Sequence, residues 1–129
     1  MTNKEKFKKL QPVWDAIEKL GWKILTNPED LDDDHDEVEI ENRSPAGEDL
    51  ILIFYLNHWE GKNLAAQAYD IYMDFDVDEN VKMWLEARDN NVSGVPSARV
   101  LVHDAEDIER MYEELSDVIA KVYRKLPVI

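Results

Sequence analysis

The chain contains no cysteine. This absence excludes a disulfide framework and thiol chemistry, and it fits a reducing compartment. The four glycines are isolated from one another, so the sequence has neither a Walker loop nor a GxGxxG dinucleotide-binding motif. It also lacks the GxSxG and HExxH motifs of hydrolases and metalloproteases. Because the sequence contains none of these catalytic motifs, we expect a protein that is not an enzyme.

Long apolar stretches are also missing. The longest one, residues 50–56, is far shorter than a helix that spans a bilayer. Residues 1–10 are charged and lack the apolar segment of a secretory signal. We therefore expect a cytoplasmic protein without a membrane partner.

Acidic side chains are what the chain has in excess. Its formal net charge is −14, and residues 26–117 alone carry 26 acidic and 6 basic side chains, a net charge of −20. Such a segment repels nucleic acid and anionic membranes and favours a partner with a basic surface. The same charge can serve solubility alone, and the composition leaves both interpretations open.

The hydrophobic pattern predicts an α+β fold in a single domain, residues 1–129, with no linker or internal repeat. Residues 37–41 alternate between acidic and apolar, which is typical of a half-buried strand. The unbroken apolar run at 50–56 predicts that residues 49–57 form a central strand covered on both faces or nearly so. With residues 22–25 as a third strand, we expect a small antiparallel sheet of about three strands packed by helices, and a helical C-terminal half.

Local signals predict where the helices begin and end. Pro12 suits the first turn of a helix that Gly21 closes. Asn63 and Asp78 are placed to cap two further helices. Asp104 is expected to start the longest helix, after a short separate helix and with Asp107 at capping-box spacing.

An acidic loop precedes the first long strand and raises the question of a metal site. Its carboxylates alternate along the chain as oxygen ligands do in calcium loops: Asp30, Asp32, Asp34, Asp36 and Glu41. However, His35 stands where the sharp-turn glycine belongs, and a strand follows where a helix should. The other histidines, His58 and His103, have no zinc-ligand spacing, although His58 lies near an expected groove. We expect no metal and no cofactor.

Rows of carboxylates can also imitate nucleic acid. Duplex DNA presents one charge per about 1.7 Å of its axis. A protein with a comparable array would occupy the basic groove of a nucleic-acid-binding protein without binding nucleic acid itself. The candidate partner-binding residues come from the loop, a strand and a helix: Asp30, Asp32, Asp33, Asp34, Asp36, Glu37, Glu39, Glu41, Glu106, Asp107, Glu109 and Glu113.

Two segments in the second half of the chain, FDVDENVKMWLEAR and GVPSARVLVHDAEDIERMYEEL, carry a recurrent pattern. It comprises Phe75-Asp76-x-Asp78-Glu79, Trp84-x-Glu86-Ala87-Arg88, Gly94-Val95-Pro96-Ser97 and Asp104-Ala105-x-x-Ile108. The pattern resembles a C-terminal segment of small acidic proteins from bacterial phages and mobile elements. This resemblance implies a mobile-element origin and an anti-defence role, as in anti-CRISPR or antirestriction proteins that block a host nuclease. It carries over no catalytic residues.

The leading hypothesis is a non-enzymatic inhibitor whose acidic surface binds the basic nucleic-acid groove of a defence nuclease. An acidic metal-binding or regulatory accessory protein of a mobile element is the alternative. A structural or assembly component of a phage is a third class. The sequence specifies neither the nuclease nor the oligomeric state.

Overall fold

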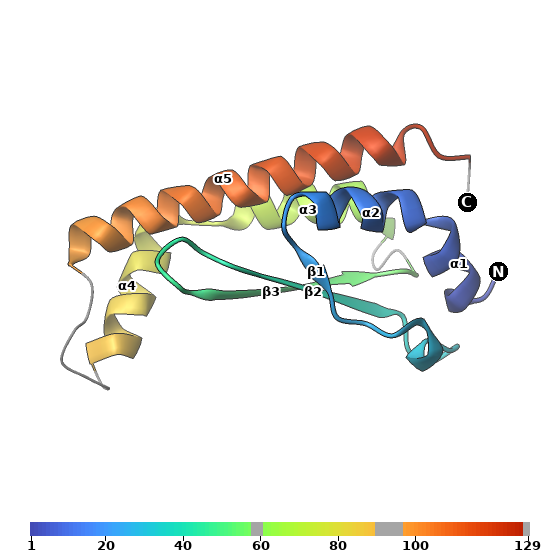
Figure 1. Ribbon diagram of the computed structural model, residues 1–129, viewed down its shortest axis with the longest axis horizontal. Helices are drawn as coiled ribbons and strands as arrows, with labels where there is room; N and C mark the ends of the chain where they lie inside the picture. Colours follow the sequence, from blue (N-terminus) through green and yellow to red (C-terminus); the bar gives the residue numbers. More distant parts are fainter. Residues whose placement is uncertain (58–60, 90–96, 128–129) are drawn as a thin grey trace.

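The computed structural model describes residues 1–57, 61–89 and 97–127. The helices at residues 11–19, 64–74 and 98–123 gather on one face of a three-stranded antiparallel sheet, which confirms the α+β prediction (Figure 1). In chain order the elements are α1 (Asn3–Lys9), α2 (Gln11–Lys19), β1 (Lys23–Ile24), the 3₁₀ helix η1 (Pro28–Asp30), β2 (Glu37–Arg43), β3 (Asp49–Tyr55), α3 (Leu64–Asp74), α4 (Val77–Asp89) and α5 (Ala98–Tyr123). No helix in the described part of the chain has both the length and the hydropathy needed to cross a membrane.

The strand order is β1-β2-β3, so β2 is the central strand and β3 lies at an edge. The prediction of a central strand at residues 49–57, covered on both faces or nearly so, is therefore wrong. Helices cover only the face that carries Leu50 and Phe54, whereas Ile51 on the other face is 58% exposed. A continuous apolar run does not distinguish a strand buried on both faces from an edge strand with apolar residues on an open face.

The local signals at the first two helices are confirmed. Pro12 lies in the first turn of α2, where its missing N–H breaks no helical hydrogen bond. Gly21 follows the end of that helix with φ +103°, a conformation that glycine adopts without strain. Residues 23 and 24 then pair with β2 as the predicted third strand.

Two helix starts differ from the predictions. The carboxylate that accepts a first-turn N–H of α4 belongs to Asp76, which bonds Glu79, while Asp78 lies within the first turn. Helix α5 is continuous from Ala98 and is capped by Ser97, so Asp104 is not a helix start. The expected turn at residues 93–96 and the environment of His58 lie outside the described residues.

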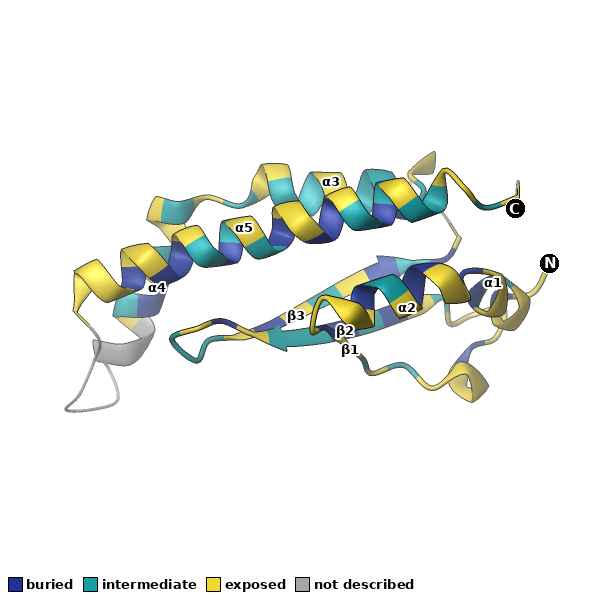
Figure 2. Ribbon diagram, turned by 45° about the horizontal axis from the view of Figure 1, so that its top comes forward, coloured by how far each residue is buried: buried dark blue, intermediate teal, exposed yellow. Residues whose placement is uncertain are grey.

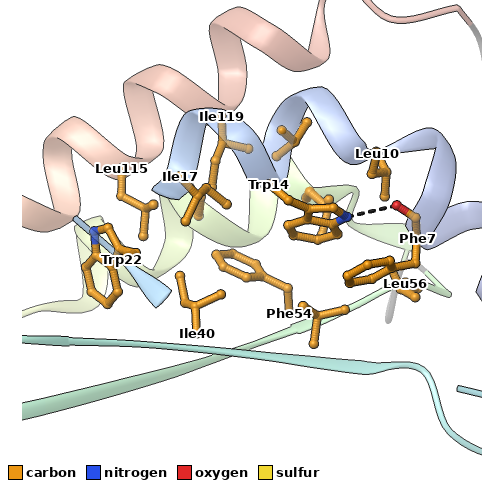
Figure 3. Packing of buried hydrophobic residues seen from close by; sticks show 14 of the residues in the cluster. Phe7, Leu10, Trp14, Ile17, Trp22, Ile40, Phe54, Leu56, Leu115 and Ile119 are labelled. Carbon is orange, nitrogen blue, oxygen red and sulfur yellow. Dashed lines mark hydrogen bonds between the residues drawn. The ribbon is translucent and has the colours of Figure 1, made fainter. Parts of the chain in front are cut away.

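The core lies between the sheet and the helices (Figure 3). Trp14 of α2 is at its centre with 1% of its surface exposed, and its ring stacks on that of Phe7 with centroids 5.2 Å apart. Farther along, Tyr112 of α5 stacks on Trp22 and meets the ring of Phe75 edge to face. Burial raises the pKa of Tyr112 to about 12. These contacts hold the helix layer against one face of the sheet. The other face is not covered by the helix layer.

Candidate functional site: the open sheet face and the acidic loop

The face of the sheet that the helices do not cover carries a row of carboxylates. Glu37, Glu39 and Glu41 alternate along β2 with the buried residues of the other face, as the period of a strand requires. In the antiparallel register they lie opposite Tyr55, Ile53 and Ile51 of β3.

In Figure 2, exposed segments alternate with more buried ones along β3, while the residues between the buried ones of β2 are mostly half-buried. The open face is therefore a mixed surface, in which a carboxylate row runs beside an apolar one.

The acidic loop between η1 and β2 is held in one conformation by a side chain of α1. Asn3 is buried, and its Nδ2 donates hydrogen bonds to the carbonyl oxygens of Asp32 at 2.6 Å and His35 at 3.3 Å. Within the loop, the carboxylate of Asp32 accepts the backbone N–H of Asp34 at 2.8 Å. These bonds join the backbone of the loop to α1, so the loop has a defined position next to the sheet.

A hollow of about 320 Å³ lies where this loop meets the sheet. Leu25 and Leu31 form its apolar part, with Thr26, Asn27 and His35 also lining it. Four predicted site residues line the same hollow: Asp30, Asp34, Glu37 and Glu39. Among the described residues no lysine or arginine lines the hollow, and His35 is its one basic neighbour. A cationic group placed there would be attracted by the carboxylates.

The other predicted residues on this side have different surroundings. Asp33 is exposed, and Glu41 continues the row at the pair with Lys23 of β1. The carboxylate of Asp36 is turned to the backbone and accepts the N–H of Asn57 at 3.2 Å. The loop and β2 thus form one acidic surface, although Asp32 and Asp36 use carboxylate oxygens to stabilise the loop itself.

The predicted residues of α5 do not join this surface, because α5 belongs to the helix layer on the opposite side of the sheet (Figure 1). Asp107 forms an ion pair with Arg110 at 2.7 Å. Glu113 and Glu109 face Tyr72 of α3, and their charge raises the pKa of its phenol. The twelve candidate residues are therefore divided between two separate acidic surfaces.

A metal site is not built from these groups. Among the side chains that the structure describes, those of residues 1–57, 61–86 and 97–127, no three His, Cys, Asp or Glu are arranged to hold a metal ion. In the loop, Asp32 is occupied by the bonds to Asp34 and His35. The geometry of the loop is that of a hydrogen-bonded turn in which Asp32 bonds its own backbone two residues on.

His35 gives this loop a measurable pH dependence. The Nδ1–H of His35 donates to Oδ1 of Asp32 at 2.7 Å. This bond raises the pKa of His35 above 6.5, with smaller contributions from the charges of Asp32, Asp34 and Glu37. It also lowers the pKa of Asp32 below 3.8, assisted by the N–H of Asp34. Both groups are exposed, so the pair affects the loop more than the whole fold.

We expect the ring of His35 to titrate above pH 6.5 in an NMR titration, and the Asp32→Asn variant to bring its pKa back toward 6.5. Because the folded-state pKa is raised, the stabilisation from protonated His35 is present in full below pH 6.5 and is lost as the pH rises through the folded pKa. The contribution of Asp32 is present above pH 3.8 and is lost as the pH falls through its lowered pKa. An unchanged pKa of His35 in the variant would contradict this assignment.

Sequence reasoning missed the residues that shape the site. Asn3 contacts the loop from 29 and 32 positions away, and nothing in the N-terminal sequence signals that bond. Thr26 extends the pairing of β1 through its hydroxyl, which accepts the N–H of Glu39 at 2.8 Å. A threonine after a short strand is a signal for such pairing, although a weak one.

Comparisons of the chain with protein-family models, with curated proteins and with solved structures find no match. The function is therefore argued from the geometry and charge of the two acidic surfaces.

Proposed function

We propose that the chain is a non-enzymatic binding protein that uses the open sheet face and the acidic loop to engage a basic protein surface. The observation that carries the proposal is the hollow beside β2, which four acidic residues line together with Leu25 and Leu31, and which no lysine or arginine of the described residues lines. An arginine or lysine side chain fits such a place, because its charged end meets the carboxylates while its apolar stem contacts Leu25 and Leu31.

The carboxylate row extends the contact beyond a single side chain. Neighbouring outward residues along one strand are two residues apart, about 6.6 to 6.8 Å. Glu37, Glu39 and Glu41 thus present a regular row of negative charges, as the phosphates of one strand of nucleic acid do. A groove that binds a phosphate backbone has the complementary arrangement of basic residues.

The basic groove of a defence nuclease is the partner that we propose. The resemblance of the second half of the chain to acidic proteins of phages and mobile elements supports this class of partner. Occupation of the groove by carboxylates would exclude the nucleic acid and inhibit the enzyme without any reaction by the inhibitor.

The test compares two triple variants that change the net charge equally. One carries Asp34→Lys, Glu37→Lys and Glu39→Lys on the sheet side, and the other carries Glu106→Lys, Glu109→Lys and Glu113→Lys on α5. Binding to a panel of purified Cas nucleases and restriction enzymes is measured by biolayer interferometry at several salt concentrations. For the nuclease that binds the unmodified chain, we expect the sheet-side variant to bind about tenfold more weakly or worse, since it removes close charge pairs.

The α5 variant is the matched control, because it makes the same change in net charge on the other side of the molecule. We expect it to change the affinity by less than about threefold, through long-range electrostatics alone. Equal losses in both variants would show that only the net charge matters. A complex insensitive to salt, or none across the panel, would contradict the proposed function.

A further inference from the structure

One edge of the sheet presents backbone groups that no other strand uses. The N–H of Leu56 donates to the carbonyl oxygen of Asp36 at 2.9 Å, beyond the end of the ladder between β2 and β3. In an antiparallel pair such bonded positions alternate. The even-numbered residues of β3 therefore bond β2, while the N–H and C=O groups of Asp49, Ile51 and Ile53 point away from the sheet.

A side chain of α3 shows how this edge can be completed. The N–H of Tyr55 donates to Oε1 of Gln67 at 2.8 Å, and Nε2 of Gln67 donates to the carbonyl oxygen of Tyr55 at 3.0 Å. The amide of Gln67 thus occupies the place of a peptide group in a neighbouring strand. Among the described residues, no group does the same for Ile51 or Ile53.

A groove runs between this edge and α3. Its volume is about 250 Å³, and Ile53 and Ile71 form its apolar part. Asp70 and Asp74 line it from α3, one turn apart on the same helix face. Asp70 is paired with Lys62, whereas Asp74 is exposed and makes no hydrogen bond or ion pair within the described chain.

We infer that the free edge of β3 binds an extended peptide in which basic residues alternate with apolar ones, as an added strand. Peptide residues opposite Ile51 and Ile53 would place apolar side chains on the open face beside these isoleucines, which are 58% and 36% exposed. The intervening residues point to the other face, toward α3, where Asp74 attracts a basic side chain. A second copy of the chain is the less favourable occupant, because each copy carries a net charge of −14.

This inference rests on the backbone edge of β3 and on α3, whereas the proposed function rests on the hollow beside the acidic loop; the two share only the isoleucines of the open face. The probe is a synthetic peptide of alternating lysine and valine, Lys-Val-Lys-Val-Lys-Val-Lys, titrated into the isotopically labelled chain and followed by NMR. We expect shifts and slower hydrogen exchange of the amides of Ile51 and Ile53.

Two modified peptides with the same charge separate strand pairing from simple attraction. The valines pair with Ile51 and Ile53, so N-methylation of the valines removes the donors that the added strand needs. N-methylation of the lysines leaves these donors in place. We expect the valine-methylated peptide to bind about tenfold more weakly than the other two, which is the loss of one or two net hydrogen bonds. Equal binding of all three peptides, or shifts confined to the acidic loop, would overturn the inference.

The chain offers a matched pair of variants for the charge contact. We expect Asp74→Lys to weaken the unmodified peptide severalfold, because it replaces attraction by repulsion at the groove. Glu114→Lys on α5 makes the same change in net charge at an exposed position away from the groove. Equal effects of the two variants would overturn the placement of the peptide beside α3.

Discussion

Trp14→Ala is expected to lower the free energy of unfolding by about 3–5 kcal/mol, the usual range for removing a buried tryptophan or phenylalanine from a core. The side chain is 1% exposed and contacts the centre of the hydrophobic core. It also donates a buried hydrogen bond from Nε1 to the carbonyl oxygen of Phe7 at 2.9 Å (Figure 3). The variant therefore loses apolar contacts, a ring stack and a buried donor at the same time.

The loss of stability would also affect the acidic loop of the candidate site, because Trp14 joins α1 to α2. Phe7 of α1 stacks on its ring, and Asn3 of the same helix holds the acidic loop. Urea unfolding followed by circular dichroism measures the change without depending on tryptophan fluorescence. Amide exchange in the loop is expected to rise in the variant even below the unfolding transition.

Two further variants separate the contributions of Trp14. Trp14→Phe keeps an aromatic ring and loses the donor, so we expect a smaller loss, about half that of the alanine variant. Tyr69→Ala removes an aromatic ring that is 54% exposed, and its effect should stay within about 0.5 kcal/mol. If Trp14→Ala were no less stable than Tyr69→Ala, the core described above would be wrong.

Much of the local structure could be predicted from the sequence, because its signals act within a few residues. Pro12, Gly21 and Asn63 have the predicted roles at helix ends, since a cap or a missing N–H affects only the adjacent turn. The carboxylate row of β2 could also be predicted from the sequence. Alternation along a strand places Glu37 and Glu39 on the same face, whichever elements the sheet contacts.

The arrangement of the layers could not be predicted in the same way. What covers residues 50–56 depends on where helices from both ends of the chain pack, and hydrophobicity alone does not say that one face stays open. The separation of the acidic residues into two surfaces also depends on how the helices pack on the sheet. Glu37 and Glu113 both belong to acidic segments, so the sequence does not show that they lie on different surfaces. They do so because α5 packs on the opposite side of the sheet from the open face.

Asp104 is the clearest case of a residue whose role depends on distant contacts. Its spacing to Asp107 suggested a helix cap, but the structure buries it in the interior of α5 with 2% of its surface exposed. Its carboxylate accepts the hydroxyl of Ser44, 60 positions away, at 2.7 Å and the N–H of Ala46 at 2.8 Å. The hydroxyl of Ser44 in turn accepts the N–H of Glu48. One carboxylate therefore joins the turn between β2 and β3 to the helix layer.

Asp104→Ala is expected to destabilise the fold by about 3 kcal/mol, because two hydrogen bonds to a charged group are lost together. Their donors, the buried hydroxyl of Ser44 and the N–H of Ala46, would have no replacement acceptor on the shortened side chain. Asp104→Asn keeps one acceptor oxygen but replaces the other with a donor, so a smaller loss is expected. Chemical denaturation at neutral pH measures all of these changes.

Asp107→Ala is the matched control, because its carboxylate pairs with Arg110 at the surface of the same helix and should contribute less than about 0.5 kcal/mol. The connection itself is tested by combining Asp104→Ala with Ser44→Ala. If the two side chains stabilise the fold through their mutual bond, the double variant loses less than the two single losses added together. Strict additivity would mean that the bond between Ser44 and Asp104 adds nothing to stability, and that Asp104 holds the turn between β2 and β3 only through the N–H of Ala46.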